Sequence, residues 1–291
     1  MDFLSYLING LSLGSVYAII ALGYTMVYGI AKMLNFAHGD VIMVGAYVVF
    51  FAISSFHMPL AVGLLLSIAV CTVLGITIER LAYKPLRQAS SLSVLITAIG
   101  VSYFLQNAAQ LFWSSSTKVF PSVLSNGALQ LGGLSISYLT LVTIGTCILV
   151  MACLMLFINH TSTGRAMRAC SEDKGAATLM GINVNLIISI TFAIGSGLAA
   201  IASVLLCAAY PSVYPTLGAM PGIKAFTAAV FGGIGSIPGA FLGGLLLGII
   251  EIFAKAYIST QLSDAIVFAV LIIVLLIRPT GLLGRRIREK V

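Results

Sequence analysis

Charged residues are scarce in this sequence. Asp, Glu, Lys and Arg make up 8% of its 291 residues, whereas 60% are hydrophobic. Soluble domains carry about three times as much charge, so this composition excludes an ordinary soluble fold. The mean hydropathy is +1.12, and the apolar residues form runs of about twenty, the length of a transmembrane helix. The alternation typical of membrane β-strands is absent. The sequence therefore predicts an all-α polytopic membrane protein.

Sequence motifs for catalysis and metal binding are missing as well. There is neither a GxxxxGK[ST] phosphate-binding loop nor an HExxH motif, and the three histidines are scattered. Five cysteines show no CxxC spacing, and four of them lie in apolar runs, where cysteine packs as a small hydrophobic residue. We therefore expect no catalytic residue, no metal and no cofactor, and no ATP hydrolysis by this chain itself.

Lys and Arg outnumber Asp and Glu by 15 to 8, which gives a net charge of +7. The cations flank apolar runs, so they indicate the topology of cytoplasmic loops rather than nucleic-acid binding. The three clusters are Arg80, Lys84 and Arg87; Arg165, Arg168 and Lys174; and Arg278, Arg285, Arg286, Arg288 and Lys290. We expect all three in the cytoplasm. The polar segment at about 113–137 contains only Lys118 and is expected in the periplasm.

Nine transmembrane helices are the best interpretation, within a range of eight to ten. They cover about 7–30, 41–56, 60–78, 92–112, 138–157, 186–208, 217–231, 240–257 and 262–277. With the carboxyl terminus in the cytoplasm, nine crossings put the amino terminus in the periplasm. The seventh run is short and contains Lys224, so a half-helix is an alternative. Residues 1–291 form a single transmembrane domain, because no stretch remains for a soluble one.

Glycine-containing breaks interrupt the apolar runs near both ends of the chain. The stretch MDFLSYLING lacks a basic residue, so we expect the first run to remain as a helix rather than act as a cleaved signal. After it, LNFAHGD separates the first two helices, and GGIGSIPG separates the seventh from the eighth. Such paired breaks indicate either a degenerate repeat beside a transport path or ordinary tight turns.

The polar stretch HTSTGRAMRACSEDKGAATLMGINVN, residues 160–185, stands out between apolar runs. Ser171 is a suitable N-cap, and Gly181 supplies a left-handed stop, which together predict a helix of about nine residues. A helix this short is marginal in water. It is therefore either a solvated loop or a small helix that docks its apolar side chains into a groove of another protein.

The same stretch resembles the ATPase-coupling loop of membrane subunits of bacterial ABC importers in the branched-chain amino acid permease family, LivH type. Similar stretches cover almost the whole chain and include NGLSLGSVYAIIALGYTMVYGIAKMLNFAHGD, ERLAYKPLR, SVLITAIGVSYFLQN, FTAAVFGGIGSIPGAFLGG and LIRPTGLLGR. The resemblance implies a type II ABC importer-like permease fold in the bacterial inner membrane. It also implies a second related permease, two cytoplasmic ATP-binding subunits and a periplasmic substrate-binding protein as partners.

The coupling segment, about 158–185, then has a mechanical role. Its pattern residues are Gly164, Arg165, Ala166, Ala176, Ala177, Gly181, Ile182 and Asn183. Arg165 and Arg168 either pair with acids of an ATPase or only fix the topology. Candidate residues of the translocation path are Asn35, His38, Asp40, Gln106 and Gln110.

Ionisable and amide side chains within the runs leave two interpretations open. Asp40 either stabilises the start of the second helix or belongs to the path. Glu251 and Lys255 are spaced four apart and favour an ion pair over a transport carboxylate. Asp264 is expected to cap a helix at the interface. Gln106 and Gln110 either fasten neighbouring helices or bind a passing zwitterion.

The sequence thus predicts a permease subunit that forms half of a path for leucine, isoleucine and valine, in contact with lipid and not with nucleic acid. One rival is the same machine carrying another small polar solute, such as urea or a short amide. A second is an ion-coupled secondary carrier, which needs a titratable site such as Asp40 or Glu251.

Overall fold

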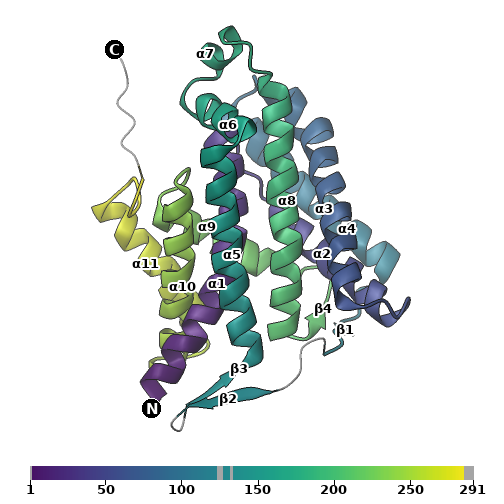
Figure 1. The fold of residues 1–291 in the computed structure, drawn as a ribbon, viewed down its shortest axis with the longest axis vertical. Helices are drawn as coiled ribbons and strands as arrows, with labels where there is room; N and C mark the ends of the chain where they lie inside the picture. The colour runs from purple at the N-terminus through teal and green to yellow at the C-terminus, as the bar shows by residue number, and fades with distance from the viewer. Residues whose placement is uncertain (1, 123–126, 132–133, 285–291) are drawn as a thin grey trace.

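Long helices run side by side through the computed structural model, which describes residues 2–122, 127–131 and 134–284 (Figure 1). The helices are α1 (Asp2–Ala31), α2 (His38–Ser54), α3 (Leu60–Ile78), α4 (Ser91–Trp113), α5 (Tyr138–His160), α6 (Ser162–Glu172), α7 (Lys174–Leu179), α8 (Val184–Ala209), α9 (Ala219–Gly232), α10 (Ile237–Tyr257) and α11 (Ser263–Ile277). A π-helical turn (Glu79–Tyr83) and a 3-10 turn (Lys84–Leu86) extend α3.

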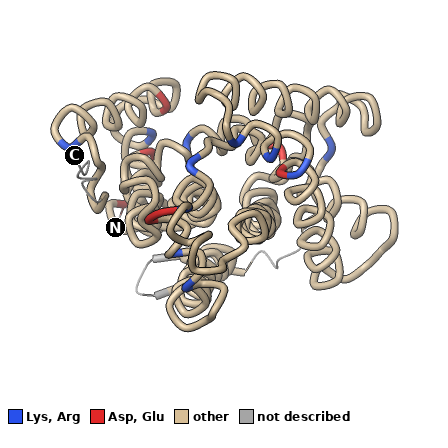
Figure 2. The backbone as a smooth tube through the Cα atoms, turned by 90° about the horizontal axis from the view of Figure 1, so that it is seen from above, with Lys and Arg blue, Asp and Glu red and all other residues tan. Residues whose placement is uncertain are grey.

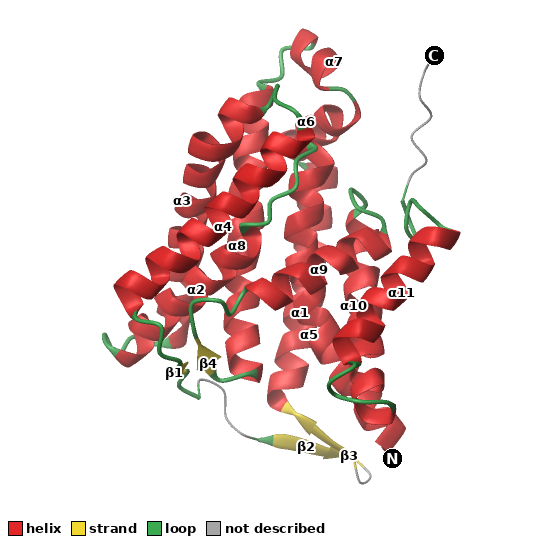
Figure 3. Cartoon of the chain, turned by 180° about the vertical axis from the view of Figure 1, so that it is seen from behind, coloured by secondary structure: helices red, strands yellow, loops and turns green. Residues whose placement is uncertain are grey.

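Within the described residues, four short strands form two antiparallel pairs. β1 (Lys118–Val119) pairs with β4 (Ser212–Val213), with Lys118 opposite Val213. β2 (Ala128–Leu131) and β3 (Leu134–Ser137) form a hairpin. Both pairs lie at the end of the molecule that holds the amino terminus, whereas α6 and α7 lie at the opposite end (Figures 1 and 3).

Six helical stretches in the described part of the chain are long and apolar enough to span a membrane. They are Asp2–Ala31, Leu60–Leu86, Ser91–Trp113, Tyr138–His160, Val184–Ala209 and Ile237–Tyr257. The predicted runs 41–56, 217–231 and 262–277 also form helices, of 17, 14 and 15 residues. At 1.5 Å per residue, α9 covers about 21 Å, less than the hydrocarbon thickness of about 30 Å. The mainly helical fold is confirmed, while the count of nine crossings stays a prediction.

The centre of the bundle is α1, which packs against α5, α8, α9 and α10. Its contact with α10 is close because glycines face one another across it. A Cβ atom on Gly248 would overlap the backbone of Gly14, and one on Gly244 would overlap that of Ala18. Small residues at such positions let two helix backbones approach, which favours association in lipid through dispersion contacts.

Two of the shorter helices start inside the bundle. The first residue of α2, His38, lies against Gly23 of α1, and Gly23 in turn faces Gly195, near the midpoint of α8. The segment before α9 contacts the start of α2, because a Cβ atom on Gly218 would overlap the carbonyl of Gly39. The amino-terminal ends of α2 and α9 therefore lie together at mid-height, and α9 crosses the middle of the molecule obliquely (Figure 3).

Charged residues are few among the mostly apolar helices (Figure 2). The clusters at 80–87 and 165–174 lie at the α7 end, where the side chain of Arg87 donates to Asn185 at the start of α8. Lys118 lies at the other end, beside β4. Two of the three predicted basic clusters thus share one end of the described chain, while the orientation in the membrane stays a prediction. Arg285, Arg286, Arg288 and Lys290 lie outside the described residues.

Candidate functional site

The segment predicted to couple to an ATPase folds as two helices. The α6 helix begins after Thr161, whose hydroxyl accepts a hydrogen bond from the Gly164 amide at 3.0 Å. Gly164, Met167 and Cys170 are buried along one side of α6, which packs against α1, α5 and α8. A Cβ atom on Gly164 would overlap the backbone at the end of α5. Glycine is therefore required where the chain turns from α5 into α6.

The boundary between the two helices corrects the expected cap. Asp173, and not Ser171, is the N-cap of α7: its carboxylate accepts from the amides of Gly175 at 2.7 Å and Ala176 at 3.0 Å. Ser171 lies in the last turn of α6 and donates to the carbonyl of Arg168. An extended Asp173 satisfies two free amides of α7, so the stretch divides there. The left-handed stop is confirmed, because Gly181 has a φ of +80°.

The tip of α7 exposes apolar side chains. Leu179 and Met180 are 89% and 82% exposed, and Ala176 is exposed as well, whereas Ala177 is buried against the rest of the protein. Beyond the tip, Asn183 caps α8 by accepting from the Leu186 amide at 3.1 Å. These contacts hold a small apolar surface away from the bundle.

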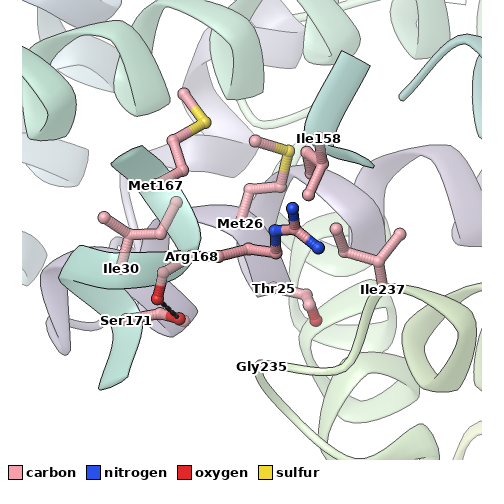
Figure 4. Close-up of a pocket in the computed structure, with 10 residues that line it drawn as sticks. Thr25, Met26, Ile30, Ile158, Met167, Arg168, Ser171, Gly235 and Ile237 are labelled. Carbon is pink, nitrogen blue, oxygen red and sulfur yellow. Dashed lines mark hydrogen bonds between the residues drawn. The ribbon is translucent and has the colours of Figure 1, made fainter. Parts of the chain in front are cut away.

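The remaining residues of the pattern take different positions around α6. Arg165 is exposed, while Ala166 and, after α7, Ile182 are half-buried. Arg168 turns toward the bundle, where its side chain lies near Thr25, Ile158 and Ile237 at a cavity of about 80 Å³ (Figure 4). Both arginines are nevertheless exposed, so either can meet a partner protein.

A contact between α7 and α1 escaped the sequence analysis. The Lys174 ammonium, at the first position of α7, donates to the carbonyl of Ala31 at 2.7 Å. A cation at the carboxyl end of a helix satisfies a free carbonyl and interacts favourably with the helix dipole. Lys174 thus ties the exposed α7 to the residue at which the longest helix ends. The sequence indicated a basic loop but not this pairing.

Among the candidate path residues, the structure brings Asp40 and Gln106 together. The Gln106 amide donates to one carboxylate oxygen of Asp40 at 2.9 Å and to the Ser102 hydroxyl at 3.2 Å. Asp40 is 1% exposed, and its second carboxylate oxygen has no hydrogen-bond partner among the described residues. A carboxylate in the third position of α2 benefits from the helix dipole, but burial makes its free oxygen costly.

The other three candidates are less alike. Asn35, between α1 and α2, accepts a hydrogen bond from the Tyr83 hydroxyl at 3.0 Å. His38 is buried, and its ring meets that of Tyr24 edge-on at 4.7 Å between centroids. Gln110 lies one turn beyond Gln106 and is exposed, and its side chain makes no hydrogen bond to another described residue. The structure therefore gathers Asn35, His38, Asp40 and Gln106 around the start of α2 and leaves Gln110 on an outer face.

A network of charges joins α1, α9, α10 and α11. Glu251 accepts from Lys224 at 2.8 Å, from Lys255 at 2.6 Å and from the Tyr17 hydroxyl at 2.9 Å. Lys224 also pairs with Asp264 at 2.6 Å. The expected ion pair of Glu251 and Lys255 is confirmed. Asp264, by contrast, is not the expected helix cap: the N-cap position of α11 is Leu262, and Asp264 lies in the first turn of the helix and neutralises Lys224. The four charges sum to zero, and this balance lets Lys224 and Glu251 lie buried within the bundle.

A third buried acid lies at the α7 end. Glu79, in the π-helical turn, has a fully buried side chain that pairs with Arg87 and accepts from the Ser189 hydroxyl at 2.7 Å. This contact joins the turn after α3 to α8. In the described part of the chain, no three His, Cys, Asp or Glu side chains converge as a metal site would require.

Comparison with known proteins gives a consistent picture. Residues 6–275 match the family described as branched-chain amino acid transport system / permease component. The chain is 49% identical to the high-affinity branched-chain amino acid transport system permease protein BraD of Pseudomonas aeruginosa, over 99% of this chain and 98% of that one. It is 48% identical to the permease protein LivH of Escherichia coli K12, with the same coverage.

A solved structure shares the fold. PsaBC from Streptococcus pneumoniae, in complex with a Fab, matches 94% of this chain and 92% of its own with a TM-score of 0.50. The sequence identity is 17%, so this likeness concerns the arrangement of helices alone.

Proposed function

This chain belongs to the family of permease components of branched-chain amino acid transport systems, and from this premise we propose that it imports leucine, isoleucine and valine as one subunit of an ATP-driven transporter. It forms half of the translocation path and performs no chemistry itself. The observation that carries the proposal is the 48–49% identity to BraD and LivH over 99% of the chain.

The exposed tip of α7 supports an ATPase as partner. Leu179 and Met180 form an apolar surface at the end of the protein where the basic clusters gather, and Arg165 lies exposed on the neighbouring helix. A rigid helix tip that enters a groove is a recurring mode of recognition. Lys174 extends this contact to Ala31, so that a displacement of α7 reaches the end of α1 and the break that follows it.

The polar residues at the start of α2 support a path for a zwitterion. In this proposal Asp40 faces the ammonium group of the passing amino acid during the conformational cycle, and Gln106 holds the carboxylate of Asp40 in place. The amino-terminal ends of α2 and α9, which meet at Gly39 and Gly218, favour negative charge and so suit the carboxylate of the solute. The two groups of the zwitterion thus find opposite charges at mid-height.

The assembly around the chain follows from the same proposal. A second related permease completes the path, two ATP-binding subunits bind the α7 end in the cytoplasm, and a periplasmic binding protein delivers the solute at the β2–β3 end. The amino terminus is then periplasmic and the carboxyl terminus cytoplasmic, with all nine apolar helices in the bacterial inner membrane.

Uptake of labelled leucine, combined with co-purification, tests the proposal. The informative variant is Leu179→Asp with Met180→Asp, and the matched control is Leu179→Met with Met180→Leu, which keeps the apolar area. We expect the charged variant to fold, to lose its ATPase subunits and to lose uptake, while the control retains both. A wild-type chain that purifies alone after crosslinking, with uptake that survives ATP depletion, contradicts the proposal.

The same assay separates the rivals. Unlabelled isoleucine and valine should compete with leucine, whereas excess urea should not. An ion-coupled carrier depends on an ion gradient instead of ATP, so collapsing the gradient distinguishes it. Glu251 is unsuited to an ion-coupling role, because three donors already occupy its carboxylate.

A further inference from the structure

A cavity of about 350 Å³ lies at the α7 end, where four segments meet. Its wall comes from the end of α1, the 3-10 turn after α3, the start of α4 and the start of α7. This cavity is separate from the residues around Asp40 and from the exposed tip of α7. The transport function proposed above uses the contact of Lys174 with Ala31 in its wall but assigns the cavity no ligand.

Three cations from three of these segments line the cavity: Lys32, Arg87 and Lys174. Of these cations, Arg87 forms an ion pair with an acid, Glu79. Its second oxygen is occupied by the Ser189 hydroxyl. The lining residues of the cavity include no Asp or Glu. The cavity therefore carries an uncompensated positive charge.

The hydrogen-bond donors of these cations are mostly free. Lys174 uses one ammonium hydrogen on the carbonyl of Ala31 and has two left, since an ammonium carries three. The Nε atom of Arg87 is buried without a partner. Burial, and after it the nearby charges of Arg87 and Lys32, lower the pKa of Lys174. An anion in the cavity would relieve this repulsion and accept the free hydrogens.

Two further features point to the kind of anion. The 23-residue helix α4 begins at the cavity with Ser91, so the positive end of its dipole faces the same space. The rest of the wall is apolar and includes Leu34, Val94 and Leu95. The cavity thus combines cationic donors with apolar side chains at the boundary of the apolar helices. This combination suits an amphipathic ligand that is charged at one end and apolar at the other.

We propose that this cavity binds a phosphate ester anion, with Lys32, Arg87 and Lys174 as its donors. The anion is either the head group of an anionic phospholipid, which also uses the apolar wall, or a free phosphate from the aqueous phase. In both cases the bound anion ties α7 to the ends of α1 and α4. Lys174 then responds both to the bound anion and to the proposed ATPase contact.

Thermal denaturation of the full chain, purified in mild detergent with the partners it retains and stripped of lipid, tests the proposal. The ligands are phosphatidylglycerol, phosphatidylcholine and inorganic phosphate. The variant is Lys32→Gln with Lys174→Gln. The matched control, Arg80→Gln with Lys84→Gln, removes two exposed cations from the same end but outside the cavity wall.

The expected result is a rise of the wild-type denaturation midpoint with phosphatidylglycerol and not with phosphatidylcholine. Loss of both lysines should weaken the apparent affinity by roughly 30-fold, since each cation near the surface contributes about 1 kcal/mol. The single variant Lys32→Gln keeps the contact of Lys174 with Ala31, and its apparent affinity for the ligand should fall roughly fivefold. It provides the test if the double variant does not fold.

The responses to the different ligands show whether the bound anion is a lipid head group or free phosphate. If inorganic phosphate alone stabilises the wild type and not the double variant, the cavity takes free phosphate. The proposal is overturned if wild type and double variant respond equally, or if the control variant loses as much affinity as the double variant. It is also overturned if the stripped wild type responds to neither phosphatidylglycerol nor inorganic phosphate. Loss of the ATPase with an unchanged lipid response also overturns it, because the cations then serve the protein contact.

Discussion

At the scale of single residues, the buried acids divide into satisfied and unsatisfied ones. Glu251 and Glu79 are each held by several donors. Asp40 has Gln106 and one oxygen without a partner. A fold optimised for stability alone would not retain such a group, because an unpaired buried carboxylate costs several kcal/mol. Natural proteins keep such costs where function requires them.

Asp40→Asn should therefore separate stability from transport. The amide removes the buried charge but keeps the shape, so we expect an unchanged or higher denaturation midpoint. We also expect leucine uptake to fall at least about tenfold, since one lost charge-assisted hydrogen bond is worth roughly 1.5–3 kcal/mol. Paired melting and uptake measurements check both. A lower midpoint with normal uptake would assign Asp40 to the fold.

Glu251→Ala, unlike Asp40→Asn, should lower the denaturation midpoint. It leaves Lys224 buried with only Asp264 as counter-ion and removes the acceptor of Tyr17. Breaking a buried ion pair costs roughly 3–5 kcal/mol, and so the denaturation midpoint should drop sharply. Lys255→Ala is the control: this partner is 29% exposed, and its loss should cost roughly 0.5 kcal/mol. Equal midpoints for the two variants would contradict the network.

At the scale of helices, the close contact of α1 and α10 is the most sensitive interface. Gly248→Ala places a methyl group into the backbone of Gly14 and should cost roughly 1–3 kcal/mol by overpacking. Gly145→Ala, in the exposed face of α5, meets nothing within 4 Å and should be neutral or stabilising by up to about 1 kcal/mol. Denaturation midpoints of both variants check the contrast. Equal effects would mean that these two helices do not pack as described.

Whether the sequence could predict an element depends on whether the interactions that form it are local in the chain or join distant segments. The apolar runs located the helices because a lipid-facing backbone must satisfy its hydrogen bonds within each helix. The division between α6 and α7 could not be predicted, because Ser171 and Asp173 are both good caps and packing of Met167 and Cys170 decides between them.

Contacts between distant segments were beyond the sequence for a different reason. Asp40 and Gln106 are 66 residues apart, and their meeting depends on how α2 and α4 are rotated. The same holds for Lys224, whose two acidic partners lie on separate helices. The sequence marked each residue as costly in a membrane, but only the packed bundle determines which of them become partners.

At the scale of the whole molecule, the two ends differ in charge and in shape. The α7 end contains the clusters at 80–87 and 165–174 together with exposed apolar side chains, whereas the other end has Lys118 and the β2–β3 hairpin. We propose from the positive-inside rule that the α7 end lies in the cytoplasm, which is also where ATP is available. Orientation and coupling are therefore one hypothesis, and a topology measurement tests both.

Thiol labelling gives that measurement. Cys153 is the exposed native cysteine, and the others in the described chain are buried, so Cys153→Ala provides a quiet background for Gln130→Cys in β2 and Thr178→Cys on α7. We expect a membrane-impermeant maleimide to label the Gln130→Cys variant in intact spheroplasts and the Thr178→Cys variant only in inside-out vesicles. Bound ATPase subunits should slow the labelling at position 178. The reverse pattern would put α7 outside, beyond the reach of any cytoplasmic ATPase, and the coupling role would fail with the orientation.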